Sequence, residues 1–477
     1  MTIRKSNSFL LIILIFTFSI LFTSCNKGLK EGTIIFTQVS SNLENNNNVN
    51  NPFGRLITGS QIMALSPDKT DEKPKWLTKG YFSACSPIIS NDGKSMVFTA
   101  QKNQNDVWQI FKMDLENLKI AQITSAKENC LDPTFLPDGQ LLYSKFKKEG
   151  LFNQSFSLYT YNFKENKSQQ ITFKPHAYYA STILHDGRIL TVSKQLYPAK
   201  KEAMFMALRP DGTKEELFYK SPKEHSLFSR AYEVSNHKVA FIESDSSSTQ
   251  GGSIVTINYN RPLHSRENLS SKIQGLFYAL YPQKEDKWLV TYRPSSQDKF
   301  ALFEFNSENK TLGKHLYKDA NFNVLQVVVV KKHKRARILP SEIKLGAPTG
   351  LLLCQNINAP RLMSNGKESS SVKASKIEIL GIESSLGTVA VEEDGSFYLN
   401  IVANTPFRLQ TLSKDGKIIK SPSSWIYVRP NERRGCVGCH TDNEQVPENR
   451  QPLAVKKSPQ KVPVPFNEVN KIKESLK

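Results

Sequence analysis

A repeat opens at SPIISNDGK, residues 86–94, and runs into MVF at residues 96–98. A second copy is DPTFLPDG at residues 132–139, and a third is STILHDGR at residues 181–188. Each copy places an Asp-Gly step between two short apolar segments. This pattern predicts a β-hairpin, because a tight type I′ turn needs positive φ and glycine adopts it without strain.

The copies recur at a period that suits one blade of a β-propeller. Asp92, Asp138 and Asp186 are about 46 to 48 residues apart, and weaker copies continue this period downstream. Residues 54–353 resemble the propeller of TolB-like proteins. We predict six blades, the sixth shared between residues 55–77 and 323–353 so that the two ends of the ring pair. An open β-sandwich with ordinary hairpins is the alternative.

A second pattern begins near Lys376 and ends at Val428. Its clearest part is GTVAVEEDGSFYL at residues 387–399, where apolar and polar residues alternate on both sides of another Asp-Gly step. Alternation of this kind is typical of half-buried strands. We predict a small β-sandwich-like domain of about five strands at residues 376–428.

The N-terminus predicts export. Two basic residues precede an uncharged apolar run at residues 9–22, which is too short to span a membrane as a helix and leads to Cys25. This stretch resembles a lipobox, so we expect residues 1–25 to be a lipoprotein signal peptide and Cys25 to carry the lipid that anchors the chain to the bilayer. An ordinary signal peptide with an incidental cysteine is the alternative. Residues 26–53 include four consecutive asparagines and have the composition of a flexible tether.

The run Cys436-Val437-Gly438-Cys439-His440 predicts one covalently attached haem c. Two thiols at this spacing can add to the two vinyl groups of a porphyrin, and His440 then directs its imidazole at the iron. The alternatives are a zinc site, which would need a second ligand pair, and a thiol redox pair, which would sit in a βαβ pattern. We therefore assign Cys436 and Cys439 to the haem and His440 to the iron, in a C-terminal c-type haem segment and tail at residues 429–477. The predicted fold is all-β.

Six cysteines are present in the sequence. Setting aside Cys25 and the haem pair leaves Cys85, Cys130 and Cys354, an odd number that excludes a fully paired disulfide framework. Cys85 and Cys130 occupy similar places in two successive repeats. A disulfide between them is an alternative to two unbonded thiols.

The haem run leaves the second axial ligand open. Neither His nor Met follows His440 in the sequence, so a sixth ligand would come from upstream or be absent. His264, in RPLHSR at residues 261–266, is one candidate.

The segment that begins near Asn431 is too short to bury a porphyrin by itself. We therefore expect upstream groups to complete the site. The candidates to cover the haem faces are Trp425, Tyr427 and Phe407, and those to pair with the propionates are Arg433 and Arg434.

The formal net charge is +20, and the densest basic cluster is KKHKRAR at residues 331–337. Export and the lack of interleaved aromatic residues argue against nucleic acid as a partner. The cluster favours an acidic redox partner protein or anionic lipid. The alternative is a solvated edge strand that continues VVVV at residues 327–330, because Lys and Arg protect sheet edges from aggregation.

The sequence also looks like the hydrazine synthase alpha-subunit-like family. The resemblance runs from Val391 through Trp425 to the haem run, with PENRQP at residues 447–452 behind it, and includes RPLHSR. It implies a propeller joined to a β domain that bears a c-type haem at Cys436, Cys439 and His440. It does not imply hydrazine synthesis, because Glu444 stands where that enzyme has a tyrosine ligand four residues after the motif histidine.

Together these features predict an exported, membrane-anchored monohaem c-type cytochrome lipoprotein, which transfers electrons with its propeller as a docking platform. We expect it in the cell envelope, facing the periplasm or the surface. Asn26, in place of an aspartate after Cys25, favours the outer membrane. Two alternatives remain: a haem-dependent oxidoreductase acting on a small molecule at an open iron site, and a non-redox propeller that serves as a binding scaffold.

Overall fold

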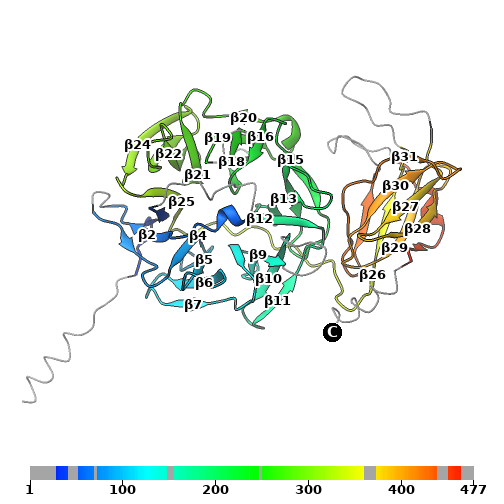
Figure 1. Ribbon diagram of the computed structural model, residues 1–477, viewed down its shortest axis with the longest axis horizontal. Coiled ribbons are helices and arrows are strands. Elements are labelled where there is room, and N and C mark those ends of the chain that lie inside the picture. The colour runs from blue at the N-terminus through cyan, green and yellow to red at the C-terminus, as the bar shows by residue number, and fades with distance from the viewer. Residues whose placement is uncertain are drawn as a thin grey trace, which may run out of the picture.

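The chain folds into two all-β units, a ring of blades and a smaller sandwich (Figure 1). The computed structural model describes residues 28–40, 52–68, 72–147, 155–235, 237–245, 250–358, 372–437 and 449–463. Within these residues the elements are strands and three short 3-10 helices, so the all-β prediction is confirmed. None of the described helices is long and apolar enough to cross a membrane.

The ring is built largely from antiparallel meanders of consecutive strands, because each hairpin returns the chain beside the strand that precedes it. In Figure 1 the first strand of a blade lies toward the centre of the ring and the last toward its rim. The blades of consecutive strands are β4 (Ser83–Ile89), β5 (Ser95–Gln101), β6 (Gln109–Asp114) and β7 (Ile120–Gln122); β8 (Cys130–Phe135), β9 (Leu141–Lys147), β10 (Ser155–Asn162) and β11 (Lys167–Gln170); β12 (His176–Ile183), β13 (Ile189–Gln195), β14 (Ala203–Leu208) and β15 (Glu216–Lys220); β16 (His225–Leu227) and β17 (Tyr232–Val234) with β18 (Lys238–Asp245), β19 (Ser253–Asn258) and β20 (Glu267–Asn268); and β21 (Leu276–Pro282), β22 (Lys287–Arg293), β23 (Ala301–Asn306) and β24 (Thr311–Tyr317).

A further blade closes the ring by joining its two ends. β25 (Asn323–Val329) pairs with β1 (Ile34–Val39), and β2 (Gln61–Leu65) and β3 (Lys75–Trp76) complete the sheet. The two ends pair as predicted, but the N-terminal part starts earlier. β1 lies inside the predicted tether of residues 26–53, and all of its residues are buried. The tether prediction is therefore wrong for this strand, which packs between its neighbours in the closing blade.

The inner strands carry a bulge that turns polar groups toward the centre of the ring. The register of β8 against β9 shifts between Leu131 and Thr134, and Asp132 inside this shift has a φ of 53°. Ser86 occupies the same place in β4, with a φ of 56°. A bulged residue of this kind leaves the regular ladder and redirects its side chain. Asp132 is thereby free to bind a partner in the ring centre.

After β25 the chain crosses one face of the ring as an extended segment, residues 331–344, which we call the strap. The His333 N–H donates to the Asn91 carbonyl at 2.9 Å, and the Arg337 N–H donates to the His185 carbonyl at 3.0 Å. The strap thus binds the hairpin turns of the blades. The edge-strand alternative for residues 331–337 is wrong, because their N–H groups bond to turns and not to a sheet ladder.

The second unit is a sandwich of two four-stranded sheets around one apolar core. It is larger than the predicted domain of residues 376–428. β26, at residues 349–354, was expected to belong to the propeller, and β32 and β33 come from the C-terminal segment. The first sheet holds β32 (Arg433–Cys436), β26 (Thr349–Cys354), β29 (Phe397–Val402) and β33 (Gln460–Lys461); the second holds β28 (Ser385–Ala390), β27 (Lys376–Leu380), β30 (Arg408–Leu412) and β31 (Ile418–Lys420).

Candidate haem segment and the propeller centre

Cys436 ends strand β32 at one edge of the sandwich. β32 pairs in parallel with β26, and this register places Cys436 opposite Cys354. Cys354 is fully buried, whereas Cys436 is partly buried and packs against the apolar core. The Gln355 N–H donates to the Cys436 carbonyl at 2.8 Å. The first thiol of the predicted haem run is therefore held in a defined position at the rim of an apolar core.

The other predicted site residues, Cys439, His440 and Cys25, lie outside the described residues. The chain on the far side of the run is held in place by Arg450, whose guanidinium donates to the carbonyls of Gln355 at 3.1 Å and Asp394 at 2.8 Å. Gln355 therefore contacts the chain on both sides of the run, through its N–H before it and through its carbonyl after it. The described residues on the two sides of the run are thus fixed at the same strand end.

The chemistry of these residues fits a c-type haem. The run offers two thiols and an imidazole, the groups needed for two thioether bonds and one iron ligand. Cys436 is neither sealed in the core, where a porphyrin could not reach it, nor on an unsupported tail. β32 would hold one edge of the group through Cys436, and Cys439 and His440 would supply the other two donors.

The aromatic side chains expected to cover the haem have no surface left for it. Trp425, Tyr427 and Phe407 are at most 1% exposed. The Tyr427 hydroxyl donates to the Gly212 carbonyl at 2.8 Å, and the Trp425 indole N–H donates to the Tyr197 carbonyl. Both acceptors belong to the propeller. The prediction that these rings cover a haem is wrong, because two of them bind the sandwich to the propeller and the third lies in the sandwich core.

The two arginines expected to pair with propionates differ in position. Arg434 donates to the backbone carbonyls of Glu215 and Tyr427 and so belongs to the contact between the two units. Arg433, the preceding residue of β32, is exposed. Only Arg433 keeps a solvent-facing guanidinium beside the run.

A buried carboxyl group completes the contact between the two units. Glu432 is 1% exposed and accepts from the backbone N–H groups of Arg429 at 2.7 Å and Lys214 at 3.0 Å. Burial raises the pKa of Glu432, although the charge of Arg434 acts in the opposite direction. The Arg429 guanidinium donates to the Asp211 carbonyl at 2.9 Å. The residue that precedes β32 is thus fixed to the propeller.

His264 lies on the same side of the propeller as this contact. It is exposed and ends the short helix η2 (Pro262–His264), which packs against β15. Arg434 of β32 binds Glu215, the residue directly before β15. The structure therefore brings η2, with the candidate sixth ligand, and β32, which ends at Cys436, to one outer strand of the propeller.

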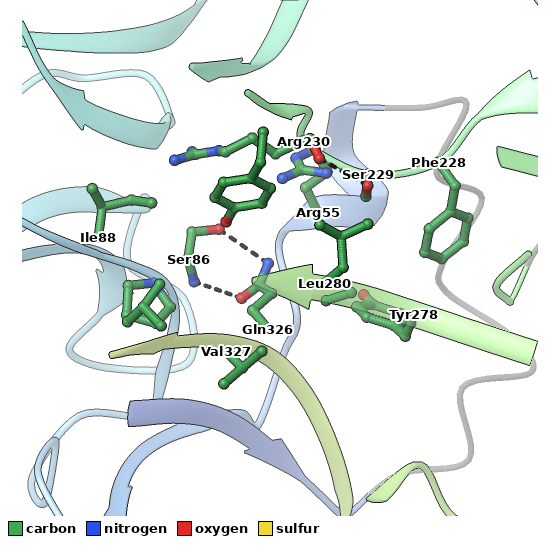
Figure 2. Close-up of a pocket in the computed structure, with 14 residues that line it drawn as sticks. Arg55, Ser86, Ile88, Phe228, Ser229, Arg230, Tyr278, Leu280, Gln326 and Val327 are labelled. Carbon is green, nitrogen blue, oxygen red and sulfur yellow. Dashed lines mark hydrogen bonds between the residues drawn. The ribbon is translucent and has the colours of Figure 1, made fainter. Parts of the chain in front are cut away.

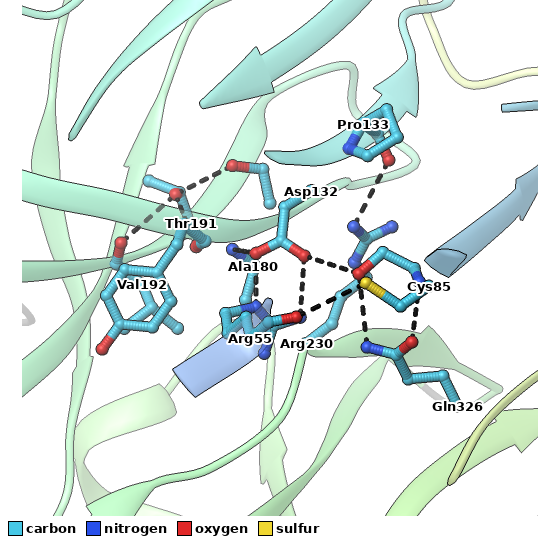
Figure 3. A network of polar contacts seen from close by, with 12 residues as sticks. Arg55, Cys85, Asp132, Pro133, Ala180, Thr191, Val192, Arg230 and Gln326 are labelled. Atoms are coloured by element: carbon cyan, nitrogen blue, oxygen red, sulfur yellow. Dashed lines mark hydrogen bonds and ion pairs between the residues drawn. The ribbon is translucent and has the colours of Figure 1, made fainter. Parts of the chain in front are cut away.

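The centre of the propeller holds a second polar site, which the sequence did not reveal (Figure 3). Arg55 lies on η1 (Pro52–Arg55) and donates from two nitrogens to the carboxylate of Asp132. Ala180 N–H and Ser86 hydroxyl donate to the same carboxylate at 2.9 and 3.2 Å. Burial alone would raise the pKa of Asp132, but the charge and hydrogen bonds of Arg55 hold it below its ordinary value.

No local sequence pattern predicts this ion pair, because Arg55 and Asp132 are 77 residues apart. One signal was visible: the second repeat has Asp132 where the first repeat has Ser86. A carboxylate at an inward-facing bulge needs a cation in the ring centre.

The disulfide considered between Cys85 and Cys130 is not formed. Both residues are fully buried, and each thiol donates to a different carbonyl: Cys85 to that of Arg55 at 3.6 Å and Cys130 to that of Glu128 at 3.8 Å. Burial raises the pKa of the Cys85 thiol to about 11. These thiols are therefore held protonated within the blades.

Comparison with known proteins confirms the predicted family resemblance. Residues 334–441 match the family described as hydrazine synthase alpha subunit middle domain. The hydrazine synthase subunit alpha of Kuenenia stuttgartiensis is 20% identical to this chain in an alignment 537 positions long. The alignment covers 85% of this chain and 65% of that subunit. This chain therefore spans about two thirds of the length of that relative.

Two solved structures align with most of the fold. The Kuenenia stuttgartiensis hydrazine synthase structure covers 91% of this chain and 72% of its own, at 18% identity and a TM-score of 0.76. TolB from Acinetobacter baumannii covers 63% of this chain and 66% of its own, at 15% identity and a TM-score of 0.45. The first alignment shows that the propeller and the sandwich share the fold of that enzyme's chain.

Proposed function

Because the chain is hydrazine synthase alpha-subunit-like and carries that family's middle domain, we propose that it is an exported, lipid-anchored monohaem c-type cytochrome that transfers electrons. The observation that carries this proposal is Gln355, which binds the described chain on both sides of the Cys-x-x-Cys-His run, at Cys436 and at Arg450. Two fixed flanks would hold an attached haem at one place and distance from a partner, whereas a free tail would let it move.

Cys436 and Cys439 would hold the haem and His440 would ligate its iron. When bound, the haem supplies a one-electron redox centre. We propose His264 as the sixth ligand, because η2 packs against β15 and Arg434 of β32 binds Glu215, the residue directly before β15. The contacts of Glu432 and Arg434 with the propeller keep this geometry rigid.

The propeller face crossed by the strap is our proposed docking surface for an acidic redox partner protein. Lys332, Lys334, Arg335 and Arg337 are exposed on the strap. The backbone contacts of His333 and Arg337 with the hairpin turns fix this positive surface to the ring. Positive charge of this kind speeds the encounter with an acidic partner. Cys25 would anchor the chain in the cell envelope, facing the periplasm or the surface. Asn26 favours the outer membrane as the membrane that holds it.

The first experiment is haem staining on a denaturing gel after expression with the cytochrome c maturation machinery. The wild type should keep its haem, and the Cys436→Ala/Cys439→Ala variant should lose it while circular dichroism shows a folded chain. The control is Cys85→Ala/Cys130→Ala, which removes two buried thiols from the propeller. A wild type without a haem band would reject the cytochrome and leave the non-redox scaffold.

The visible spectrum separates electron transfer from the oxidoreductase alternative. Six-coordinate low-spin iron is expected for electron transfer, whereas five-coordinate high-spin iron would indicate an open site for a small molecule. Anchoring has its own test: Cys25→Ala should move the protein from the detergent phase to the aqueous phase. An unchanged partition would reject the lipid anchor and leave the haem proposal untouched.

A further inference from the structure

The central cavity of the propeller contains a second arginine whose charge is poorly compensated. Arg230 lies just before β17 and is 7% exposed. Within the described part of the chain its guanidinium makes one hydrogen bond, to the Pro133 carbonyl at 3.3 Å. A guanidinium has five N–H donors, and no nitrogen of Arg230 is among the sealed polar atoms that lack a partner, so its remaining donors face space that water or a ligand can reach. Burial lowers the pKa of Arg230, as expected for a cation in such surroundings.

The nearest carboxylate cannot satisfy Arg230, because its oxygens are already taken. Asp132 accepts two hydrogen bonds from Arg55, one from Ala180 and one from Ser86. Asp132 therefore attracts Arg230 only through space. Two guanidinium groups share one carboxylate, and the centre of the ring keeps an excess of one positive charge.

Space for a counter-ion lies next to this charge. A cavity of about 50 Å³ is lined by Arg55, Arg230, Ser86, Gln326 and apolar residues (Figure 2). One water molecule needs roughly 10–15 Å³ measured in the same way, so the cavity can hold a small ion or group. Ser86 and Gln326 bind each other, with 2.7 Å between the Ser86 N–H and the Gln326 amide oxygen. Of the two arginines that line the cavity, Arg230 is the one without a hydrogen-bonded carboxylate in the described part of the chain.

A larger vestibule leads to this cavity from the strap side. It has a volume of about 990 Å³ and shares Arg230, Tyr232 and Ile88 with the inner cavity. Its outer wall is the basic part of the strap, including Lys334, Arg335 and Arg337. The wall also holds two acidic residues, Glu233, which is bound by His185, and Glu285. The basic residues of the wall outnumber them, so a vestibule of net positive charge leads to Arg230.

We propose that the cavity beside Arg230 is a binding site for a small monovalent anion, either a halide ion or the carboxylate end of a larger ligand that fills the vestibule. The shared chemistry is one negative charge that accepts hydrogen bonds from the guanidinium. A carboxylate matches the planar donor fork of arginine in a bidentate geometry. This site lies in the propeller and is independent of the haem run.

The test uses the full chain and two probes, sodium bromide and sodium acetate. Crystals grown in bromide should show an anomalous difference peak in contact with Arg230. In solution a bound probe should raise the melting temperature saturably. Arg230→Met should abolish this rise, or weaken the apparent affinity at least tenfold, while Arg433→Met, an exposed arginine of the sandwich, should keep it. Stabilisation by acetate alone identifies a carboxylate ligand, and stabilisation by bromide identifies a halide site.

Removal of the charge also has a distinctive effect without any anion. Arg230→Met should be at least as stable as the wild type in buffer that lacks both probes, because it removes a buried, poorly compensated cation. If this variant does not fold, the proposal is tested by two other measurements. Arg230→Lys, which keeps the charge but not the planar donor fork, should bind the probes more weakly than the wild type, and the wild-type crystals should show the bromide peak. Failure of both probes to stabilise the wild type, with or without a bromide peak, overturns the proposal.

Discussion

Two carboxyl groups are buried at different places, Asp132 in the propeller centre and Glu432 at the contact between propeller and sandwich. Their surroundings shift their pKa values in opposite directions. Both are 1% exposed. Asp132 has a dedicated partner in Arg55, which holds its pKa below the ordinary value of 3.8. Glu432 is bound by two backbone N–H groups, and burial raises its pKa above 4.5. The ring centre is thus built around a permanent charge, whereas the contact between the units is sensitive to protonation.

The largest effect is expected from Asp132→Asn. This change leaves Arg55 and Arg230 buried without a counter-charge, and breaking a buried pair in this way costs about 3–5 kcal/mol. The measurement is the free energy of unfolding in urea, followed by tryptophan fluorescence. Asp138→Asn is the control, because Asp138 is exposed on the turn of the same hairpin and such changes stay within about 0.5 kcal/mol. Equal losses in the two variants would contradict the central ion pair.

The hairpin turns allow the role of the strap to be isolated. Gly187 and Gly139 have φ of 92° and 88° and stand at equivalent Asp-Gly turns. A Cβ on Gly187 would lie 2.2 Å from the Arg337 carbonyl oxygen of the strap, whereas one on Gly139 would meet nothing within 4 Å. Gly139→Ala should cost about 1–2 kcal/mol from backbone strain alone. Gly187→Ala should lower the free energy of unfolding by about 1–3 kcal/mol more than Gly139→Ala, because the added methyl group would overpack against the strap.

Denaturant unfolding of both glycine variants measures this difference directly. Removing the strap contact should also loosen residues 331–344, so hydrogen exchange at the Arg337 amide should rise in Gly187→Ala. A pair of variants with equal stability and equal exchange would mean that the strap rests only loosely on the ring.

The repeats could be predicted because their signal is local, whereas the haem at the Cys-x-x-Cys-His run stays a prediction. An Asp-Gly step with flanking apolar residues determines a hairpin, and a Cys-x-x-Cys-His run is recognised from five residues. β1 was missed because it lies beside an asparagine-rich stretch. The polar composition of residues 26–53 as a whole predicted a flexible tether. The partner strand of β1, β25, follows nearly 300 residues later. β26 was placed in the wrong unit for the same reason, since its partners β29 and β32 lie downstream.

Long-range pairing also explains what was missed at the candidate site. Arg55 and Asp132 meet only because blades on different repeats face one centre. Trp425 and Tyr427 are near the haem run in sequence, yet they face the propeller. Sequence proximity predicted contact with the haem, and the packing of the two units decided otherwise.

A smaller effect, with its own pH dependence, is expected from Glu432→Gln. The folded pKa of Glu432 is raised, so its contribution to stability is full below about 4.5 and is lost as the pH rises through the folded value. Asp132 has the opposite sign: its contribution is present above 3.8 and is lost as the pH falls through its lowered pKa. Relative to the glutamine variant, the wild type should therefore lose stability between acid and neutral pH, by about 1 kcal/mol. Unfolding in urea across this range measures the slope, and a wild type that gains stability over it would contradict the raised pKa.

The smallest effect on stability, and the most informative one for function, is expected from His264→Ala. His264 is exposed on η2, so its loss should change the free energy of unfolding by no more than about 0.5 kcal/mol. If His264 ligates the iron, its removal opens the sixth position, and the visible spectrum should change from low-spin to high-spin while the haem stays covalently attached. His315→Ala is the matched control, because His315 is also exposed and lies on β24 of another blade. A low-spin spectrum retained in His264→Ala would show that another group binds the iron. In that case the propeller would hold β32 through Glu215 without supplying a ligand to the iron.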